Sequence, residues 1–210
     1  MEWTPITLET WNRKEYFEHF LHAVPCTYSV TATLDITALR ERKSRVYPAM
    51  LYLIAQTVNR HPEFCTALDS SGQLGIFTAM HPCYTIFHRD TETFSNLWTE
   101  YHPDYSVFLQ SYQEDLRNYG DIHRMNAKPH CPANTFPVSM IPWCNFTGFQ
   151  LNLQKGYDYL LPIFTMGQIT NQDGRTALPI SVQVHHAVCD GFHVSRFLNE
   201  LQESLHTWQD

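Results

Sequence analysis

The segment VQVHHAVCDGFHV, residues 182–194, joins two patterns that decide the fold near the end of the chain. Side chains alternate along a strand, so one strand face would carry Ile180, Val182, Val184 and His186. Beyond the segment, apolar residues recur at helical spacing, at Val194, Phe197, Leu198, Leu201, Leu205 and Trp208. The pattern predicts a strand, a tight turn at Gly191 and a terminal amphipathic helix, with a histidine at the end of an apolar face.

His186 would be partly desolvated at the end of that face. Desolvation favours the neutral imidazole near physiological pH, and the neutral form is the one that a general base requires. The alternative is a hydrogen-bonded core histidine, and the position alone favours this alternative. The strand end therefore raises the hypothesis of a catalytic base without deciding it.

Asp190 lies between the predicted strand and the predicted helix, and two roles are possible for it, which do not exclude each other. It could cap the helix by accepting backbone N–H bonds, which contributes about 1 kcal/mol. It could also anchor an arginine and so hold the turn that orients the histidine. Cys189 beside it could be a thiol nucleophile, although a small packing residue is the commoner role.

A hairpin is predicted just before this segment. Asp173-Gly174 in NQDGR is a tight-turn signal between the strand candidates 161–169 and 176–186. Further upstream, alternation predicts a half-buried strand over residues 26–37, and residues 83–90 form a shorter strand candidate.

Three helices are expected ahead of the hairpin. Asn12 with Glu15 is a capping-box signal for a helix near the N-terminus. One apolar face predicts a core helix over residues 47–60, and residues 106–120 predict another helix. Residues 121–137 hold three prolines and little periodicity, which favours a loop able to cover a site.

The order of these elements predicts the architecture. Alternating strands and helices, with a hairpin feeding the final helix, are typical of an α/β two-layer sandwich in which helices pack on one face of a mixed β-sheet. The chain has 210 residues, 43% of them hydrophobic and 14% aromatic, so it can bury a sizeable core. We expect one domain over residues 1–210.

Composition and missing motifs exclude several classes. A net charge of -7, from 21 acidic and 14 basic residues, argues against a nucleic-acid surface. We expect no membrane partner and no targeting signal, because no segment offers the roughly 18 uncharged residues of a span and no apolar run follows a basic start. Six scattered cysteines without a C-x-x-C pair favour a reducing, cytoplasmic setting. No HExxH, Cys/His cluster, GxSxG, Walker A or GxGxxG occurs, so no metal is expected.

The motif HHAVCDGFHV resembles the signature of the chloramphenicol acetyltransferases of the trimeric, non-hexapeptide type, and its shorter form HHxxxDG also marks related CoA-dependent acyltransferases. Similar stretches run along nearly the whole chain: WNRKEYF, YPAMLYLIAQTVN, FHRDTETFSNLW, SMIPWCNFTGFQLN and PIFTMG. The resemblance implies the CoA-dependent acyltransferase fold and a chloramphenicol O-acetyltransferase, an enzyme that confers resistance to the antibiotic.

The resemblance also implies roles for single residues. His186 would take the proton from the primary (3-) hydroxyl of chloramphenicol, whose oxygen attacks the thioester of acetyl-CoA in a ternary complex without an acyl-enzyme. Asp190 would pair with Arg13 and touch no substrate. Ser139 would donate to the oxyanion, and Thr165 would hold a water near it, although these two could also be an ordinary loop hydroxyl and a β-forming threonine.

The family's substrate pocket and assembly are carried over in the same way. An apolar pocket for the uncharged drug would include Phe20, Cys26, Phe108 and Leu151, each of which would equally suit a core. Phe20 stands where relatives often have tyrosine. The resemblance implies a homotrimer with active sites at the subunit interfaces and acetyl-CoA as co-substrate, although the sequence shows no strongly basic cluster for an anionic ligand.

Two alternatives stay open. The same apparatus could serve another acceptor, as in the dihydrolipoamide acyltransferase core, but such chains usually carry a lipoyl domain and linkers for which 210 residues leave no room. A protein that sequesters the drug or CoA without turnover is the other alternative. The full set of His186, Asp190, Arg13, Ser139 and Thr165 argues against it.

Overall fold

A mixed β-sheet forms the centre of the molecule in the computed structural model, which describes residues 3–153 and 158–209. Its strands lie in the order β2 (Thr27–Asp35), β10 (Arg175–His185), β8 (Ile163–Met166), β7 (Thr135–Met140), β5 (His81–His88) and β6 (Thr93–Trp98), and β9 (Thr170–Gln172) pairs with β10. β7 runs parallel to β5 and β8, whereas the other neighbours are antiparallel. The predicted mixed sheet is confirmed.

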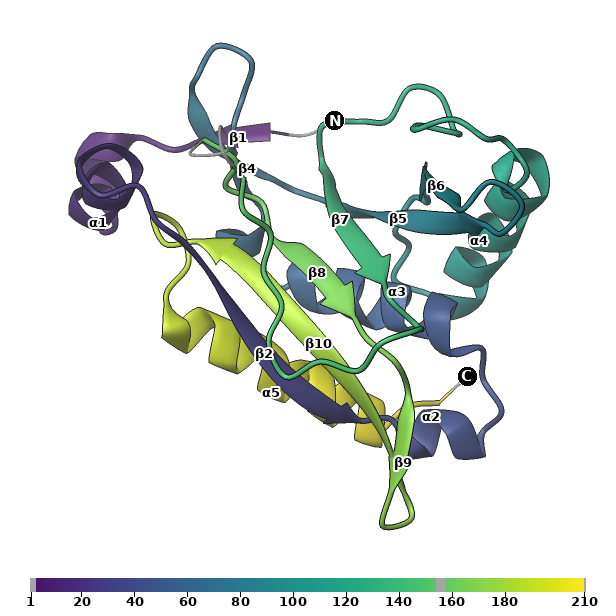
Figure 1. The fold of residues 1–210 in the computed structure, drawn as a ribbon. Helices are drawn as coiled ribbons and strands as arrows, with labels where there is room; N and C mark the ends of the chain where they lie inside the picture. Colours follow the sequence, from purple (N-terminus) through teal and green to yellow (C-terminus); the bar gives the residue numbers. More distant parts are fainter. Residues whose placement is uncertain (1–2, 154–157, 210) are drawn as a thin grey trace.

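The α-helices that follow β2 in the chain cover one face of this sheet, as Figure 1 shows. They are α2 (Thr37–Glu41), α3 (Val46–Val58), α4 (Tyr105–Tyr119) and α5 (Gly191–His206). A small separate sheet, which the sequence did not indicate, joins β1 (Trp3–Pro5), β4 (Leu74–Phe77) and β3 (Thr66–Leu68). The α/β two-layer sandwich with helices on one face is confirmed. No helix in the described ranges is long and apolar enough to cross a membrane.

The predicted hairpin is present and sets the register of the strands around the site. Asp173 and Gly174 both have positive φ, 49° and 78°, which is the backbone that a two-residue type I′ turn requires. The turn joins β9 to β10, with Arg175 opposite Gln172. After a short interruption the same side of β10 pairs with β8, which places Thr165 opposite Ser181.

β10 is buried on both faces, because a non-helical segment covers the face that the helices leave open. Figure 1 shows the chain that leaves β7 crossing in front of β10. The Ser181 hydroxyl donates to the Phe149 carbonyl at 2.7 Å. The Gln183 side chain accepts the Leu151 N–H at 2.7 Å and donates to the Leu151 carbonyl at 3.0 Å. The polar residues of β10 thus bind the covering backbone rather than solvent.

Helices α3 and α5 supply much of the core. In α3 nearly every side chain is buried, since the helix packs against β5, α4 and α5, so burial extends beyond the single face that the sequence indicated. α5 is amphipathic as predicted, and its buried residues are Val194, Phe197, Leu198, Leu201 and Leu205. α4 ends at the predicted place, where the Gly120 N–H binds the Leu116 carbonyl at 2.8 Å.

Two local predictions are wrong. The N-terminal helix α1 (Lys14–Glu18) has Arg13 rather than Asn12 at its N-cap, and no side chain caps it. Its start is held instead by a long-range contact of Arg13, and a π-helical turn, His19–Ala23, continues it. The loop predicted over residues 121–137 extends too far, because its last residues, from Thr135 onward, belong to β7. Pro137 argued against a strand, but the buried Phe136 and Val138 on either side of it supply the core face of one.

Candidate active site

His186 directly follows β10, at the edge formed by the N-terminal helix and the start of β2. Its backbone N–H donates to the Cys26 carbonyl at 2.9 Å. Its ring stacks on Phe20 with the centroids 3.9 Å apart and the planes at 15°, and Tyr28 lies edge-on at 5.3 Å. The structure therefore brings three of the predicted site residues, His186, Phe20 and Cys26, to one place.

The His186 ring is held without being enclosed. Its side chain is 31% exposed, and Nδ1 lies 3.4 Å from the Oδ1 atom of Asp190. Nδ1 itself is buried, so the accessible part of the ring lies on its other atoms. The preceding residue, His185, is the one that fits a hydrogen-bonded core histidine. It is 1% exposed, and its Nδ1 accepts the Ala187 N–H at 3.1 Å.

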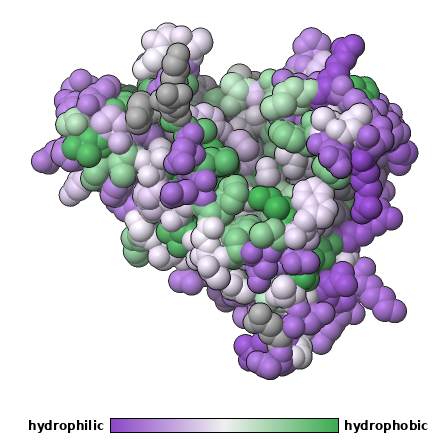
Figure 2. All heavy atoms as spheres, in the orientation of Figure 1, coloured by the Kyte–Doolittle hydropathy of each residue, from purple (hydrophilic) through white to green (hydrophobic). Residues whose placement is uncertain are grey.

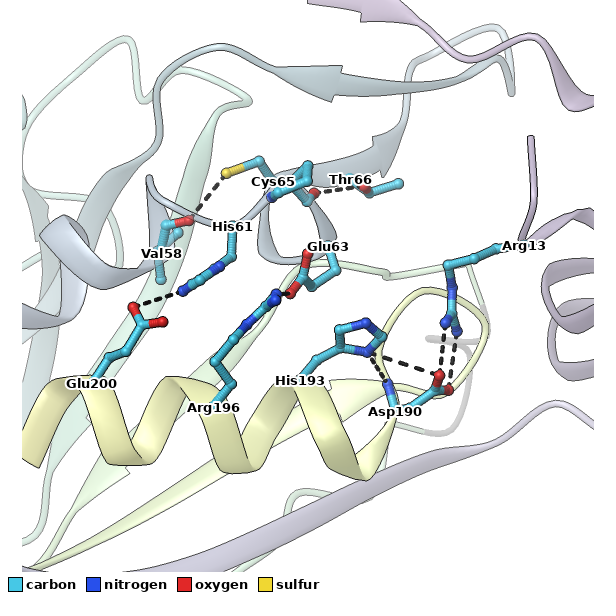
Figure 3. Close-up of polar contacts among 11 residues, drawn as sticks. Arg13, Val58, His61, Glu63, Cys65, Thr66, Asp190, His193, Arg196 and Glu200 are labelled. Carbon is cyan, nitrogen blue, oxygen red and sulfur yellow. Dashed lines mark hydrogen bonds and ion pairs between the residues drawn. The ribbon is translucent and has the colours of Figure 1, made fainter. Parts of the chain in front are cut away.

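Asp190 occupies the N-cap position of α5 and binds Arg13 through both carboxylate oxygens (Figure 3). The two contacts are 2.7 and 3.0 Å long. The Arg13 hydrogen bond lowers the pKa of Asp190, and the same bond raises the pKa of Arg13, so the pair stays ionised. The Asp190 N–H also donates to the Nδ1 atom of His193 at 2.9 Å. Asp190 therefore anchors Arg13 from the N-cap position, and the hydrogen bond at the helix start is the one from its own N–H to His193.

Cys189 is a packing residue in this turn. Its side chain is 1% exposed, and burial raises the pKa of its thiol, which opposes the thiolate that a nucleophile needs. The Tyr28 hydroxyl donates to the Cys189 carbonyl at 3.1 Å, so the backbone here also helps to fix the turn.

Two further side-chain contacts hold α5 in place, an ion pair of Arg196 with Glu63 and a hydrogen bond of Glu200 with His61. The sequence carries no signal for them beyond the one-turn spacing of Arg196 and Glu200. Figure 3 shows Arg196 reaching Glu63, and Glu200 reaching His61, from the same side of the helix. The His61 Nε2 to Glu200 Oε2 distance is 2.8 Å. Because Glu63 belongs to the short turn Pro62–Phe64 and His61 directly precedes it, these contacts hold the middle of α5 against that turn.

A second group of predicted residues lines a cavity of about 810 Å³ on the sheet face away from the helices. Ser139 on β7 and Thr165 on β8 are register partners in parallel strands, and Leu151 lies on the covering segment. Aromatic side chains supply much of the wall: Phe87, Phe94, Trp143 and Phe149. Figure 2, in the orientation of Figure 1, shows apolar side chains gathered over the middle of this face.

Phe108 does not belong to this cavity, which corrects the sequence-based expectation. It lies on α4, is fully buried, and packs against Tyr52 of α3 with the ring centroids 5.8 Å apart. Its position on the helix side of the sheet makes it a core residue. Its aromatic character suited either role, and only its element decides between them.

Within one chain, Ser139 and Thr165 lie well along the sheet from His186. Thr165 lies opposite Ser181, and His186, just beyond the end of β10, is five residues further along the chain. At about 3.3 Å per residue, this separation is roughly 16 Å, whereas a general base must come within about 3 Å of the proton that it removes. His186 is accordingly not among the residues that line the cavity.

No group of three or more His, Cys, Asp or Glu side chains within residues 3–153 and 158–209 is placed to hold a metal ion. The expected absence of a metal stays a prediction.

The chain is similar to known proteins in both sequence and fold. The family model for chloramphenicol acetyltransferase matches residues 1–202. A chloramphenicol acetyltransferase of Vibrio anguillarum is 56% identical over 210 residues, covering 100% of this chain and 97% of that protein. A chloramphenicol acetyltransferase of Clostridioides difficile is 59% identical over 205 residues, which cover 98% of this chain and 97% of that protein.

Solved structures show the same fold at lower identity. A chloramphenicol acetyltransferase superposes with a TM-score of 0.85 at 22% identity, covering 97% of this chain and all of that one. A dihydrolipoamide acetyltransferase of Azotobacter vinelandii superposes with a TM-score of 0.61 at 19% identity, covering 86% of this chain and 81% of that one. The chain belongs to the chloramphenicol acetyltransferase family of acyltransferases, and the predicted fold is confirmed.

Proposed function

We propose that this protein transfers the acetyl group of acetyl-CoA to the primary (3-) hydroxyl of chloramphenicol and thereby confers resistance to the antibiotic. The main support is its 56–59% identity to chloramphenicol acetyltransferases over almost its full length. The observation that carries the mechanism is the placement of His186, whose ring is stacked on Phe20 and faces the Arg13-bound Asp190.

His186 is the general base. The neutral imidazole removes the proton from the 3-hydroxyl while the hydroxyl oxygen attacks the thioester carbonyl. The resulting tetrahedral intermediate collapses by breaking the C–S bond, and the departing CoA sulfur recovers the proton. Both substrates are bound together, so the acetyl group passes directly between them and no acyl-enzyme forms. Asp190 and Arg13 are positioning residues, because they fix the turn that carries His186 and touch no substrate.

Ser139 and Thr165 stabilise the intermediate from neighbouring strands. The Ser139 hydroxyl donates to the oxyanion, and Thr165 holds a water beside it. Their support is that β7 and β8 place them in register at the cavity. The aromatic wall suits the uncharged ring of chloramphenicol, with Leu151 contributing from the cavity side and Phe20 and Cys26 from the His186 side.

The active site is completed between subunits of a homotrimer. The support is the separation of roughly 16 Å along β10, which keeps His186 away from the cavity of its own chain. A neighbouring chain can present its own His186 to that cavity, so that each interface holds one whole site. We place the enzyme in the cytoplasm, because all six cysteines are free thiols, as a reducing compartment would keep them.

The test is the release of free CoA thiol from acetyl-CoA, with and without chloramphenicol. Replacing the base, His186→Ala, should lower kcat by about 10²–10⁴-fold, and Ser139→Ala by about 10²–10³-fold. The exposed His22→Ala is the matched control and should leave kcat unchanged. Drug-dependent release that survives in His186→Ala would remove this histidine from the mechanism.

The same assay separates the two alternatives. A folded wild type that binds chloramphenicol without releasing thiol would be a binding protein, and release only with a different alcohol or thiol would identify another acceptor. Either result would overturn the acetylation of chloramphenicol.

A further inference from the structure

His193 is the third residue of α5, and Figure 3 shows its ring reaching toward Asp190. Its Nδ1 atom accepts the Asp190 N–H at 2.9 Å. The first N–H groups of a helix find no partner inside it, and a glutamate or glutamine at the third position commonly accepts the N–H of the N-cap residue. In this chain a histidine takes that place, so the contact that fixes the turn depends on an imidazole.

The hydrogen bond decides which nitrogen of the ring carries the proton. A backbone N–H can only donate, so Nδ1 must present its lone pair, and the proton of the neutral His193 ring is then on Nε2. A doubly protonated imidazole has no acceptor left and cannot keep this bond. The His193 side chain is 18% exposed, and its desolvation lowers its pKa, which favours the neutral ring that the bond needs.

The charged groups around the His193 ring are already paired with one another. Desolvation has the largest effect on the pKa of the ring, the carboxylates of Glu63 and Asp190 oppose it, and the guanidiniums of two arginines act with it. One of these, Arg13, binds Asp190 through both carboxylate oxygens. The other, Arg196, binds Glu63. Each carboxylate is thus engaged by a guanidinium, and neither needs a protonated imidazole as its partner.

The bond between His193 and the Asp190 N–H acts on His186 through Asp190. The Oδ1 atom of Asp190 lies 3.4 Å from Nδ1 of His186, and its Oδ2 atom lies 3.8 Å from Nδ1 of His193, so the carboxylate is close to both rings. Arg13 fixes the direction of this carboxylate, and His193 fixes the backbone that carries it. His193 itself is not among the residues that line the cavity.

We propose that His193 is a positioning residue for acetyl transfer, which accepts the Asp190 N–H and thereby holds the turn before α5 in the geometry that His186 needs. This role rests on the proposed function, in which His186 is the base. The turn requires an acceptor at the place of Nδ1. Asparagine carries its Oδ1 atom as many bonds from Cα as histidine carries Nδ1, so it can supply one, whereas leucine has a similar size and no acceptor.

The first test compares His193→Asn with His193→Leu in the thiol-release assay. Both remove the ring, but only leucine leaves the Asp190 N–H without its acceptor, so kcat should be about 10–100-fold lower in His193→Leu than in His193→Asn. The KM for chloramphenicol should stay near that of wild type in both, because His193 does not line the cavity. His206→Asn, the same change at the exposed far end of α5, is the control and should leave kcat unchanged.

The outcomes separate a positioning role from a purely structural one. Equal kcat values in the two folded variants would overturn the proposal, because a ring that only packs would be missed equally in both. A leucine variant that unfolds at lower urea concentration but keeps the kcat of wild type would also overturn it, since the bond would then stabilise the helix alone. Absence of drug-dependent release from wild type would instead overturn the proposed function and, with it, this role.

The second test determines the tautomer of His193 in wild type, so it needs neither turnover nor a folded variant. Nitrogen NMR of protein that carries isotope-labelled histidine distinguishes a ring nitrogen that bears a proton from one that presents a lone pair. At about pH 7.5 the His193 ring should carry its proton on Nε2 and leave Nδ1 unprotonated. A proton on Nδ1 would exclude the bond to the Asp190 N–H and overturn the proposal.

Discussion

Replacing Asp190 by asparagine tests how the turn that carries His186 is held. The substitution keeps the shape and one acceptor oxygen but removes the charge from a pair with contacts of 2.7 and 3.0 Å. A hydrogen bond to a charged group contributes roughly 1.5–3 kcal/mol, and solvent screening of a side chain that is 37% exposed reduces this. We expect Asp190→Asn to lower the free energy of unfolding by about 1–2 kcal/mol.

The pH dependence of this loss has a definite sign. In the folded chain the pKa of Asp190 lies below its ordinary value of 3.8, so the pair contributes its full stability above that pH. As pH falls through the lowered folded pKa, the carboxylate is protonated and the contribution disappears. Urea unfolding at one protein concentration should therefore show a gap between wild type and Asp190→Asn at pH 7 that narrows below about pH 3.8.

The kinetic consequence should appear in kcat rather than in KM. Asp190 lies 3.4 Å from the Nδ1 atom of His186 but does not line the cavity, so kcat should fall about 10–100-fold while the KM for chloramphenicol stays near that of wild type. The control is Lys14→Ala, which breaks the exposed pair with Glu18 and should cost less than about 0.5 kcal/mol. A pH-independent gap, or an unchanged kcat, would refute this account of the turn.

Further outcomes follow from the same structure. Phe20→Ala should lower kcat because the His186 ring loses its stacking partner, whereas Phe20→Tyr should retain activity, and equal kcat values for the two variants would contradict this. Arg196→Ala leaves the nearly buried Glu63 charge unpaired and should cost about 2–3 kcal/mol in thermal unfolding, and a loss below about 0.5 kcal/mol would show that the pair does not hold α5. Desolvation lowers the pKa of His193 in the folded chain. Below the ordinary value of 6.5 the unfolded chain therefore binds more protons than the folded chain, and stability falls as the pH is lowered. As the pH is lowered from about 7.5 to 5.5, wild type should lose stability relative to His193→Gln. A stability difference between the two proteins that stays constant over this range would contradict the prediction.

The sequence predicted those features that local patterns determine. The Asp173-Gly174 turn, the amphipathic α5 and the strand that leads to His186 are each encoded by a few neighbouring residues. The structure confirms them, with the strand ending one residue earlier, at His185. The start of α1 was missed because Arg13 is bound by a residue that lies 177 positions away along the chain. Long-range partners of this kind leave no periodic signal.

Other features depend on what packs against a residue rather than on its neighbours in sequence. Pro137 argued against a strand, yet β7 forms because β5 and β8 flank it. Phe108 suits a pocket or a core equally well, and its place on α4 decides for the core. The Glu63–Arg196 pair likewise joins distant elements. The single domain over residues 1–210, the homotrimer and the roles of Ser139 and Thr165 stay predictions.

The measurement that tests the central claim most directly is complementation between two inactive variants. Chains carrying His186→Ala and chains carrying Ser139→Ala are coexpressed in equal amounts, and thiol release is compared with that of each variant alone. If every site takes its histidine from one chain and its serine from the next, about a quarter of the sites in random assemblies hold both, and about a quarter of wild-type activity should return. If a site lies within one chain, no mixed site is complete. Activity no higher than that of the separate variants would contradict the account.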